Sequence, residues 1–591
     1  MPFKFKRSGN VSDSPKANSS TSTLHSDTAH PVAIVHKHAI GSSDNLNHSE
    51  KAQSSTQPAP LASSNGDAEK GASSNGDVPT DETQYLTGAK LYLVLGSLIL
   101  IMILVSLDQT IVAAAIPAIS NDFNALSDVG WYGSAYLLTG TAFQPVLGKA
   151  FTYFSLKWTY IACTVVFLVG SLICGVAQDS TTFIVGRAIA GVGFGGLYVG
   201  VLAIASAIVP VERQAAVISF LSAWYGVGCT IGPIIGGSFT TKVTWRWCFY
   251  INLPIGGVAL VLAVLFLNPP PRKQEMSAFD RLRRLDFLGT CILIGSVICL
   301  LLALQDGGVK RSWSSSVVIG ELVGFVLLLA SYAGIQYWLG ENASIVPRVL
   351  KNRNIAMLAV TNMSVGTAYF TLLYFVPFYF QAVRGSSAIR SSVQTLPLIV
   401  LLIVCIILAG GIADKKGTFN GQLLMGTALA SIGCGLLTTL KVDSSTGIWV
   451  GFQILAGVGI GLSAMMPYIG SQIVTQDPKD RPAAGVIAIF AQTLAAAIML
   501  SSCQAIYQNK LLEGIKQIPG IDVKLVIDSG VSAFREILPP EFVPLVAEKA
   551  VWALSKVFLV GAVFAAFGFV TASTVQWIRL QPGDKVSAGA A

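Results

Sequence analysis

Two ionisable side chains lie inside long apolar stretches, where a lone charge could carry chemistry. Asp108 lies in Leu107-Asp-Gln-Thr-Ile-Val112, and Arg187 in Val185-Gly-Arg-Ala-Ile189. Burying a charge in a membrane is costly unless the charge is compensated. On helices, they would lie about 13 Å and about 8 Å from the same membrane surface and could pair. The pair could exchange a proton when substrate or conformation weakens it, or it could be a static ion pair that only fixes helix packing.

A glycine-rich run could bend and pack a helix. Gly228, Gly232 and Gly236 recur every four residues, with Gly237 and Pro233 beside them. Small residues at this spacing let two helices approach closely, and proline weakens the local hydrogen-bond ladder. Taken alone, the run predicts a packing face.

Aromatic and amide side chains recur in the same apolar stretches and suit a cavity for bulky organic molecules. Each is individually typical of helix packing or of the membrane interface as well. The predicted cavity residues are Gln109, Tyr132, Tyr136, Gln144, Asn362, Tyr369, Tyr374, Tyr468 and Gln472.

The composition indicates that lipid surrounds the helices carrying these residues. The chain has 591 residues, 52% hydrophobic and only 12% charged, and its mean hydropathy is +0.63. The nine cysteines lie in apolar runs and suggest no disulfide or metal framework. The net charge of +8 reflects loops between spans, so we expect no nucleic-acid partner. Without a nucleotide-binding loop or catalytic grouping, we expect no enzyme and no cofactor, with energy supplied by gradients.

Apolar runs of about 20 residues predict fourteen membrane-spanning helices. They lie near Leu91–Ala118, Val129–Lys149, Tyr160–Ala177, Thr182–Ile208, Ala215–Phe239, Phe249–Leu267, Phe287–Leu304, Val317–Leu339, Ile355–Gln381, Val393–Ala413, Gly421–Leu440, Ile448–Val474, Ala484–Gln508 and Val551–Trp577.

The spans predict an all-α membrane protein in five parts. Residues 1–89 form a disordered tail, 90–267 an N-terminal six-helix bundle, 268–340 a loop with two additional spans, 341–578 a C-terminal six-helix bundle with a long outer loop at 509–550, and 579–591 a second tail. Lys and Arg are more frequent in the loops assigned to the inside, so both termini are expected in the cytoplasm.

Several of these segments resemble the major facilitator superfamily, in particular its fourteen-spanner drug:proton antiporters and fungal exporters of toxins and secondary metabolites. The first-span signature is similar at Leu107–Val112, and the fourth-span motif at Gly186-Arg-Ala-Ile-Ala-Gly191. The Gly-Pro run of the fifth span, Trp245-Arg-Trp-Cys-Phe-Tyr-Ile-Asn-Leu-Pro254 and Phe378-Tyr-Phe-Gln-Ala-Val-Arg-Gly385 are similar as well.

The resemblance implies two six-helix bundles with two extra central spans, and a proton-coupled exporter in the plasma membrane. Asp108 and Arg187 would serve proton coupling, and the fifth-span glycines with Pro233 the bending during alternating access. The expected partners are a small organic substrate, protons and the lipid bilayer, and the expected state is a monomer. Alternatives are a siderophore transporter, a vacuolar amino-acid transporter of the same fold, and a membrane receptor for such compounds.

One loop departs from the family pattern. After the second span the superfamily usually carries Gly-x-x-x-Asp-Arg-x-Gly-Arg-Lys, whereas this chain has Gly148, Thr152, Ser155 and Lys157 in a run without the acidic residue. The second-half counterpart, which contains Asp414, is closer to the pattern. We therefore expect the closed gate to depend on Asp414.

Overall fold

The structure, a computed structural model, describes residues 88–123, 125, 128–269, 277–308, 311–521, 535 and 538–578. The chain divides into a unit of residues 1–80 and a unit of residues 81–591. The first unit lies outside the described residues, and with it most of the predicted tail 1–89. The predicted C-terminal tail lies almost entirely outside them as well.

The first half of the helical unit, here called the N half, contains six predicted spans. Its helices are α1 (Gly88–Phe123), α2 (Val129–Tyr153), α3 (Leu156–Val176), α4 (Ser180–Ile208), α5 (Val211–Lys242), α6 (Trp247–Tyr250) and α7 (Asn252–Phe266). A connecting part follows, with α8 (Ala278–Arg283), α9 (Phe287–Asp306), α10 (Ser316–Leu339), the 3-10 turn η2 (Gly340–Asn342) and α11 (Pro347–Leu350).

The second half, the C half, contains the last six predicted spans. Its helices are α12 (Arg353–Phe378), the π-helical turn η3 (Tyr379–Val383), α13 (Ala388–Lys416), α14 (Asn420–Leu437), α15 (Thr446–Ser463), α16 (Met466–Val474), α17 (Arg481–Ile515) and α20 (Val543–Ser573). No β-strand occurs in the described residues, which confirms the predicted all-α class.

Each predicted span corresponds to a helix, but fewer than fourteen qualify as spans by length and composition. Within the described ranges, twelve are long and apolar enough to cross a membrane. The other two predicted spans are α2 and α14. Polar residues lower the hydropathy of both: α2 contains Gln144 and Lys149, and α14 begins Asn420-Gly-Gln. The count of fourteen therefore stays a prediction.

Some boundaries differ from the prediction because hydropathy does not detect helix breaks or helices that extend beyond the lipid. The predicted sixth span is interrupted at Ile251, and the twelfth between Ser463 and Met466, where Pro467 opens α16. The predicted outer loop 509–550 is shorter, because α17 continues to Ile515 and α20 begins at Val543. About a third of that predicted loop therefore belongs to two spanning helices.

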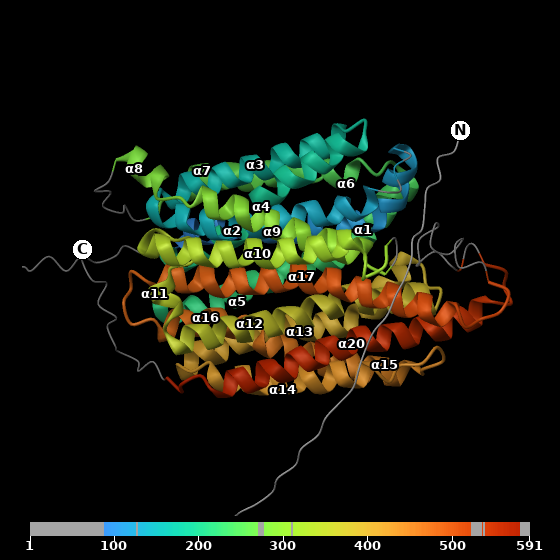
Figure 1. Cartoon of the computed structure of the whole chain (residues 1–591). Coiled ribbons are helices and arrows are strands. Elements are labelled where there is room, and N and C mark those ends of the chain that lie inside the picture. Colours follow the sequence, from blue (N-terminus) through green and yellow to red (C-terminus); the bar gives the residue numbers. More distant parts are fainter. Residues whose placement is uncertain are drawn as a thin grey trace, which may run out of the picture. The chain divides into compact units, whose positions relative to one another are not determined.

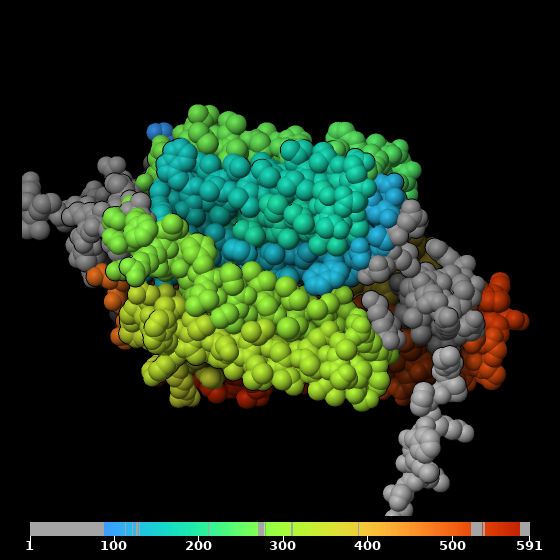
Figure 2. Space-filling model, turned by 45° about the horizontal axis from the view of Figure 1, so that its top comes forward, coloured from blue at the N-terminus to red at the C-terminus, as the bar shows by residue number. Residues whose placement is uncertain are grey.

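Helix packing divides the bundle into its two halves and defines the seam between them. In the N half α1 packs on α5, and α4 packs on α2 and α3. The halves meet where α5 packs along α13 and where α2 packs along α17, and the α9–α10 hairpin contacts both α2 and α17. Figure 2 shows this hairpin, in light green, directly below the blue and teal N-half helices on one face. The accessory helices therefore cover one side of the seam.

Positive charge gathers at one end of the bundle, here called the basic end, at the left of Figure 1 with α8 and α11. The short α6 lies at the opposite end. The basic end carries Arg281, Arg283, Arg284, Arg348, Lys351, Arg353, Lys415, Lys416, Lys479 and Arg481. Exposed leucines, valines and phenylalanines cover the outer faces of the helices between the two ends, as expected where lipid replaces water.

Candidate functional site

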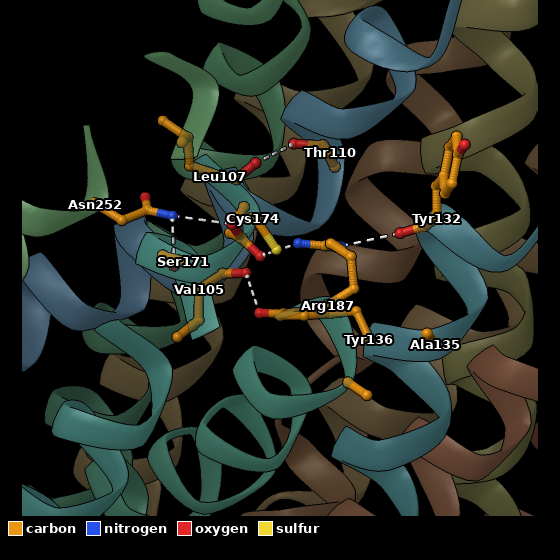
Figure 3. Close-up of polar contacts among 12 residues, drawn as sticks. Val105, Leu107, Thr110, Tyr132, Ala135, Tyr136, Ser171, Cys174, Arg187 and Asn252 are labelled. Carbon is orange, nitrogen blue, oxygen red and sulfur yellow. Dashed lines mark hydrogen bonds and ion pairs between the residues drawn. The ribbon is translucent and has the colours of Figure 1, made fainter. Parts of the chain in front are cut away.

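A buried ion pair joins α1 to α4 within the N half. Arg187 Nη1 lies 2.6 Å from Asp108 Oδ2, and the side chains are 1% and 0% exposed. A buried charge is costly unless paired and hydrogen-bonded. The structure thus brings together the two residues that the sequence singled out. Figure 3 shows the Arg187 side chain with its contact to Tyr132.

Close approach of α4 to α2 holds Arg187 in place. A Cβ atom on Gly191 would lie 2.3 Å from the carbonyl oxygen of Tyr136, so only glycine fits where α4 crosses α2. Because the two helices lie this close together, Arg187 Nε donates a hydrogen bond of 2.9 Å to the Tyr132 carbonyl oxygen of α2. The family-like Gly-Arg-Ala-Ile-Ala-Gly motif therefore sets the depth and direction of the guanidinium.

Two aromatic rings surround the guanidinium and exclude water from it. Its central carbon lies 4.4 Å from the centre of the Tyr136 ring and 5.8 Å from that of Phe249. Tyr136 is itself fixed, because its hydroxyl donates to the Val105 carbonyl oxygen of α1 over 3.1 Å. Cation–π attraction of this kind partly replaces the lost hydration of a buried cation.

Asn252 is a partner of Asp108 that the sequence reasoning missed. Its Nδ2 donates to Asp108 Oδ1 over 2.9 Å and to Ser171 Oγ over 3.1 Å, and all three side chains are fully buried. The helix break at Ile251 makes Asn252 the first residue of α7 and directs it toward α1. Each carboxylate oxygen of Asp108 thus has a donor, and Figure 3 shows Asn252 with its contact to Ser171. The sequence feature that could have pointed to Asn252 is its position inside the family-like segment Trp245–Pro254.

A layer of tyrosines lies beside the ion pair, where the two halves face each other. The Tyr225 hydroxyl donates to Gln109 Oε1, and Tyr374 of α12 lies near the same amide. Tyr369 of α12 lies near Cys229 of α5. Three predicted cavity residues, Gln109, Tyr369 and Tyr374, therefore gather at one place, and Tyr225 joins them without having been predicted.

The tyrosine layer is closed in this conformation. A cavity of about 10 Å³ adjoins it, lined by Gly226, Tyr369, Leu372, Leu373, Leu398, Ile399, Leu402 and Ile460. A volume of this size holds about one water molecule. An organic substrate would have to separate the halves in order to enter.

Other predicted cavity residues lie at helix contacts away from this layer. Thr493 donates to Gln144 between α2 and α17, Asn362 donates to the Ala488 carbonyl oxygen over 2.8 Å, and Gln472 donates to that of Arg481 over 3.1 Å. The Tyr132 hydroxyl lies 3.0 Å from Ser180 Oγ, toward the end of the bundle opposite the basic end. Tyr468 is buried near Ser206. The structure places these residues as polar contacts between neighbouring helices.

The glycine stripe of α5 faces α1. A Cβ atom would lie 2.6 Å from the Ile103 carbonyl oxygen if added at Gly228, 2.1 Å from Thr110 Oγ1 at Gly232, and 2.7 Å from the Ile111 carbonyl oxygen at Gly236. Gly237 has nothing within 4 Å. Three of the four predicted glycines therefore allow the helix that carries Asp108 to approach α5.

Comparison with known proteins decides the family. The family model of the Major Facilitator Superfamily matches residues 98–500. The chain belongs to the major facilitator superfamily. It is 38% identical over 515 residues to the "MFS-type efflux pump MFS1" of Arthroderma benhamiae, covering 86% of this chain and 96% of that protein. This finding confirms the predicted resemblance.

Two further relatives carry the names of efflux pumps. The "Rubrofusarin-specific efflux pump aurT" of Gibberella zeae is 38% identical, and the match covers 84% of this chain and 91% of that protein. The "Efflux pump aflT" of Aspergillus parasiticus is 37% identical, with 85% and 98% covered.

Solved structures confirm the superfamily fold. A bacterial homologue of the human lysosomal transporter Spinster, inward-facing and occupied, matches with a TM-score of 0.53 at 15% identity, covering 83% of this chain and 97% of its own. A double-Trp mutant of XylE matches with 0.53 at 14% identity, covering 84% and 96%. At these identities the matches support the fold alone.

This superfamily member joins its halves at the basic end through two different devices. In the first, Asp414 Oδ1 and Oδ2 of α13 accept from the backbone N–H groups of Ala215 and Ala216, near the start of α5, at 3.1 and 2.9 Å. A carboxylate is favoured near a helix N-terminus by the helix dipole. The carboxylate predicted to support the gate thus lies across the seam.

The second device is the altered loop, which uses packing and a lysine in place of a carboxylate. A Cβ atom on Gly148 would lie 2.5 Å from a methyl group of Val486, so α2 and α17 touch there. Lys149 Nζ donates to the Ala343 carbonyl oxygen over 3.1 Å, in the segment that leads to the C half. Lys157 remains within the N half, donating to the Val264 carbonyl oxygen over 2.7 Å.

The Asp414→Ala variant is expected to open the basic end more often. It removes two charge-assisted hydrogen bonds across the seam, of which each contributes about 1.5–3 kcal/mol. Ser219 of α5 packs against Gly410 of α13 there, so a Ser219→Cys reporter should be labelled about tenfold faster by a thiol reagent at that end. Tandem mass spectrometry assigns the label to position 219 and distinguishes it from the native Cys229 of the same helix.

The matched control is Asp477→Ala. Asp477 lies at the same end but accepts from the Lys479 backbone N–H within its own loop. The Asp477→Ala variant should leave the labelling rate of the Ser219→Cys reporter unchanged. Equal rates in the two variants would show that Asp414 does not hold the seam closed.

Proposed function

We propose that the chain is a proton-coupled efflux transporter that exports small organic toxins or secondary metabolites by alternating access. The observation that carries this proposal is the fully buried Asp108–Arg187 pair, placed beside a closed tyrosine layer between the halves. The names of its relatives support export as the direction of transport. The basic loops support a cytoplasmic position for the basic end and for both termini.

The geometry suggests how proton and substrate exclude each other. Asp108 Oδ1 and Oδ2 each have a donor. The next residue, Gln109, contacts the tyrosine layer, so one turn of α1 carries both the carboxylate and the contact to the layer. Substrate that separates the tyrosines would move this turn and weaken the Arg187 contact. Asp108 would then bind a proton from the open side and release it after the opposite end opens. Such reciprocal coupling is what antiport requires.

The tyrosine layer favours neutral or weakly charged aromatic cargo. Tyr225, Tyr369 and Tyr374 supply apolar faces with hydroxyl groups, whereas Arg187 is already paired. A basic amino acid would need an additional carboxylate near this layer. For this reason we rank the hypothesis of a vacuolar amino-acid transporter below that of an exporter in the plasma membrane. We also expect the protein to act as a monomer, without enzymatic activity or a cofactor.

The Asp108→Asn variant tests the proposal directly. In inside-out vesicles with an imposed pH gradient, it is expected to abolish accumulation of the cargo while protein levels stay near normal. Rubrofusarin, which the name of one relative specifies, is the first probe, followed by a panel of secreted aromatic metabolites. Transport by the variant at the wild-type rate under the gradient would overturn proton coupling at this residue.

A further inference from the structure

One buried atom beside Asp108 lacks the hydrogen bond that its surroundings lead us to expect. Asn252 is 0% exposed, and its Nδ2 donates to Asp108 Oδ1 and to Ser171 Oγ. Its Oδ1 is buried without a hydrogen-bond partner. An acceptor left unpaired in a dry site costs free energy, and such a group therefore needs an explanation.

The chemistry of a carboxyl group supplies that explanation. An ionised carboxylate only accepts hydrogen bonds, so the NH₂ end of the amide must face it. A protonated carboxyl group gains an O–H donor and needs an acceptor. An amide carries both ends on one short side chain, and half a turn about the Cβ–Cγ bond exchanges them.

We propose that Asn252 is the positioning partner of Asp108 in both protonation states, donating through Nδ2 to the carboxylate and accepting through Oδ1 from the protonated acid after the amide rotates. The inference rests on the proposed function, since it assumes that Asp108 takes up a proton. In this step one O–H bond forms at Asp108 Oδ1, and one breaks in a hydronium ion on the open side. After protonation Asp108 is neutral, so the net charge of the Asp108–Arg187 pair is the positive charge of Arg187.

Among the side chains around Asp108, Asn252 is the one best placed to accept a hydrogen bond from the protonated acid. The titratable groups around it are Arg187 from α4, Tyr136 from α2, Cys174 from α3 and Cys248 from α6, with Cys229 of α5 behind the tyrosine. Arg187 has donors only, and the Tyr136 hydroxyl points at the Val105 carbonyl oxygen, whereas Asn252 already bonds to Asp108. Asn252 Oδ1 is the neighbouring side-chain acceptor that remains unpaired.

The test compares two substitutions of nearly equal shape. Asn252→Thr keeps a hydroxyl that can donate and accept, whereas Asn252→Val has the same branching and can do neither. The readout is infrared difference spectroscopy of the full chain in lipid during a pH titration, which needs no substrate. The carboxyl C=O band that disappears in Asp108→Asn belongs to Asp108.

Three results are expected. In the wild type an amide C=O band shifts to lower frequency at the same pH as the Asp108 band appears, because the free Oδ1 gains a hydrogen bond. Both Asn252 variants lose the amide shift. The midpoint of the Asp108 band moves to higher pH in Asn252→Val by about one unit, a tenfold change, because the charged form loses the stronger bond. It moves by less than half of that in Asn252→Thr.

A control separates this role from loss of packing. Asn420 is another buried amide whose Oδ1 has no partner, and its Nδ2 donates to the Gln576 carbonyl oxygen at the basic end. Asn420→Val should leave the midpoint of the Asp108 band unchanged. If the wild type shows no coincident amide shift, or if Asn252→Val and wild type titrate alike, the inference fails while proton coupling stands. If no carboxyl band disappears in Asp108→Asn, the proposed function fails as well.

Discussion

Replacing Arg187 alone should destabilise the protein more than replacing Arg187 together with Asp108. The Arg187→Gln variant leaves the Asp108 carboxylate charged and buried, which costs about 3–5 kcal/mol. The double variant Asp108→Asn/Arg187→Gln leaves two neutral amides in the same space. Loss of the Tyr132 hydrogen bond and of the Tyr136 ring contact occurs in both, so it cancels in the comparison. The midpoint of thermal unfolding of the detergent-solubilised protein measures the difference.

A partly exposed ion pair at the end opposite the basic end is the control for this measurement. Arg246 Nη1 lies 3.0 Å from Asp122 Oδ2, with side chains 25% and 45% exposed. Water screens such a pair, so Arg246→Gln should change stability by about 1 kcal/mol or less. Equal unfolding temperatures for Arg187→Gln and the double variant would show that the buried charges do not depend on each other.

Transport by the double variant then decides between the two interpretations of the pair. If the pair only fixes helix packing, the double variant recovers both stability and gradient-driven accumulation. If Asp108 binds the transported proton, stability recovers but accumulation does not. Stability and coupling can thus be separated at one site.

The sequence allowed the helices and the ion pair to be predicted because each has a local signal. An apolar run of 20 residues suffices to predict a helix in lipid, and a lone Asp108 or Arg187 in such a run is conspicuous. The helix breaks at Ile251 and Ser463 have weaker signals, since hydropathy averages over them. The same averaging left the extensions of α17 and α20 undetected.

Asn252 and the roles of the amides could not be predicted in the same way. A buried amide serves equally well as a cavity handle or as a contact between helices, and only the packing of neighbouring helices separates the two uses. Gln109 and Gln144 illustrate this, because one contacts the tyrosine layer and the other contacts Thr493 at the α2–α17 seam. Asn252 meets Asp108 through the packing of α7 on α1 and α3.

The α1–α5 contact gives the second large effect, in the Gly228→Ala variant. The added Cβ atom would lie 2.0 Å from Ser106 Oγ and 2.6 Å from the Ile103 carbonyl oxygen. Because one of these atoms belongs to the backbone, the helices must shift, which costs about 1–3 kcal/mol. The shift moves the helix that carries Asp108, so we expect both a lower unfolding temperature and a severalfold loss of gradient-driven transport.

Gly237→Ala is a control on the same helix. Its Cβ atom would meet nothing within 4 Å, and alanine favours a helix over glycine by about 1 kcal/mol, so stability should hold or rise. A second-site change tests the cause: Ser106→Ala removes the hydroxyl oxygen but leaves the Ile103 carbonyl oxygen in place. The double variant Gly228→Ala/Ser106→Ala should therefore stay impaired. Full rescue would place the obstruction in the serine side chain, and equal behaviour of Gly228→Ala and Gly237→Ala would show that close approach of α1 to α5 is not required.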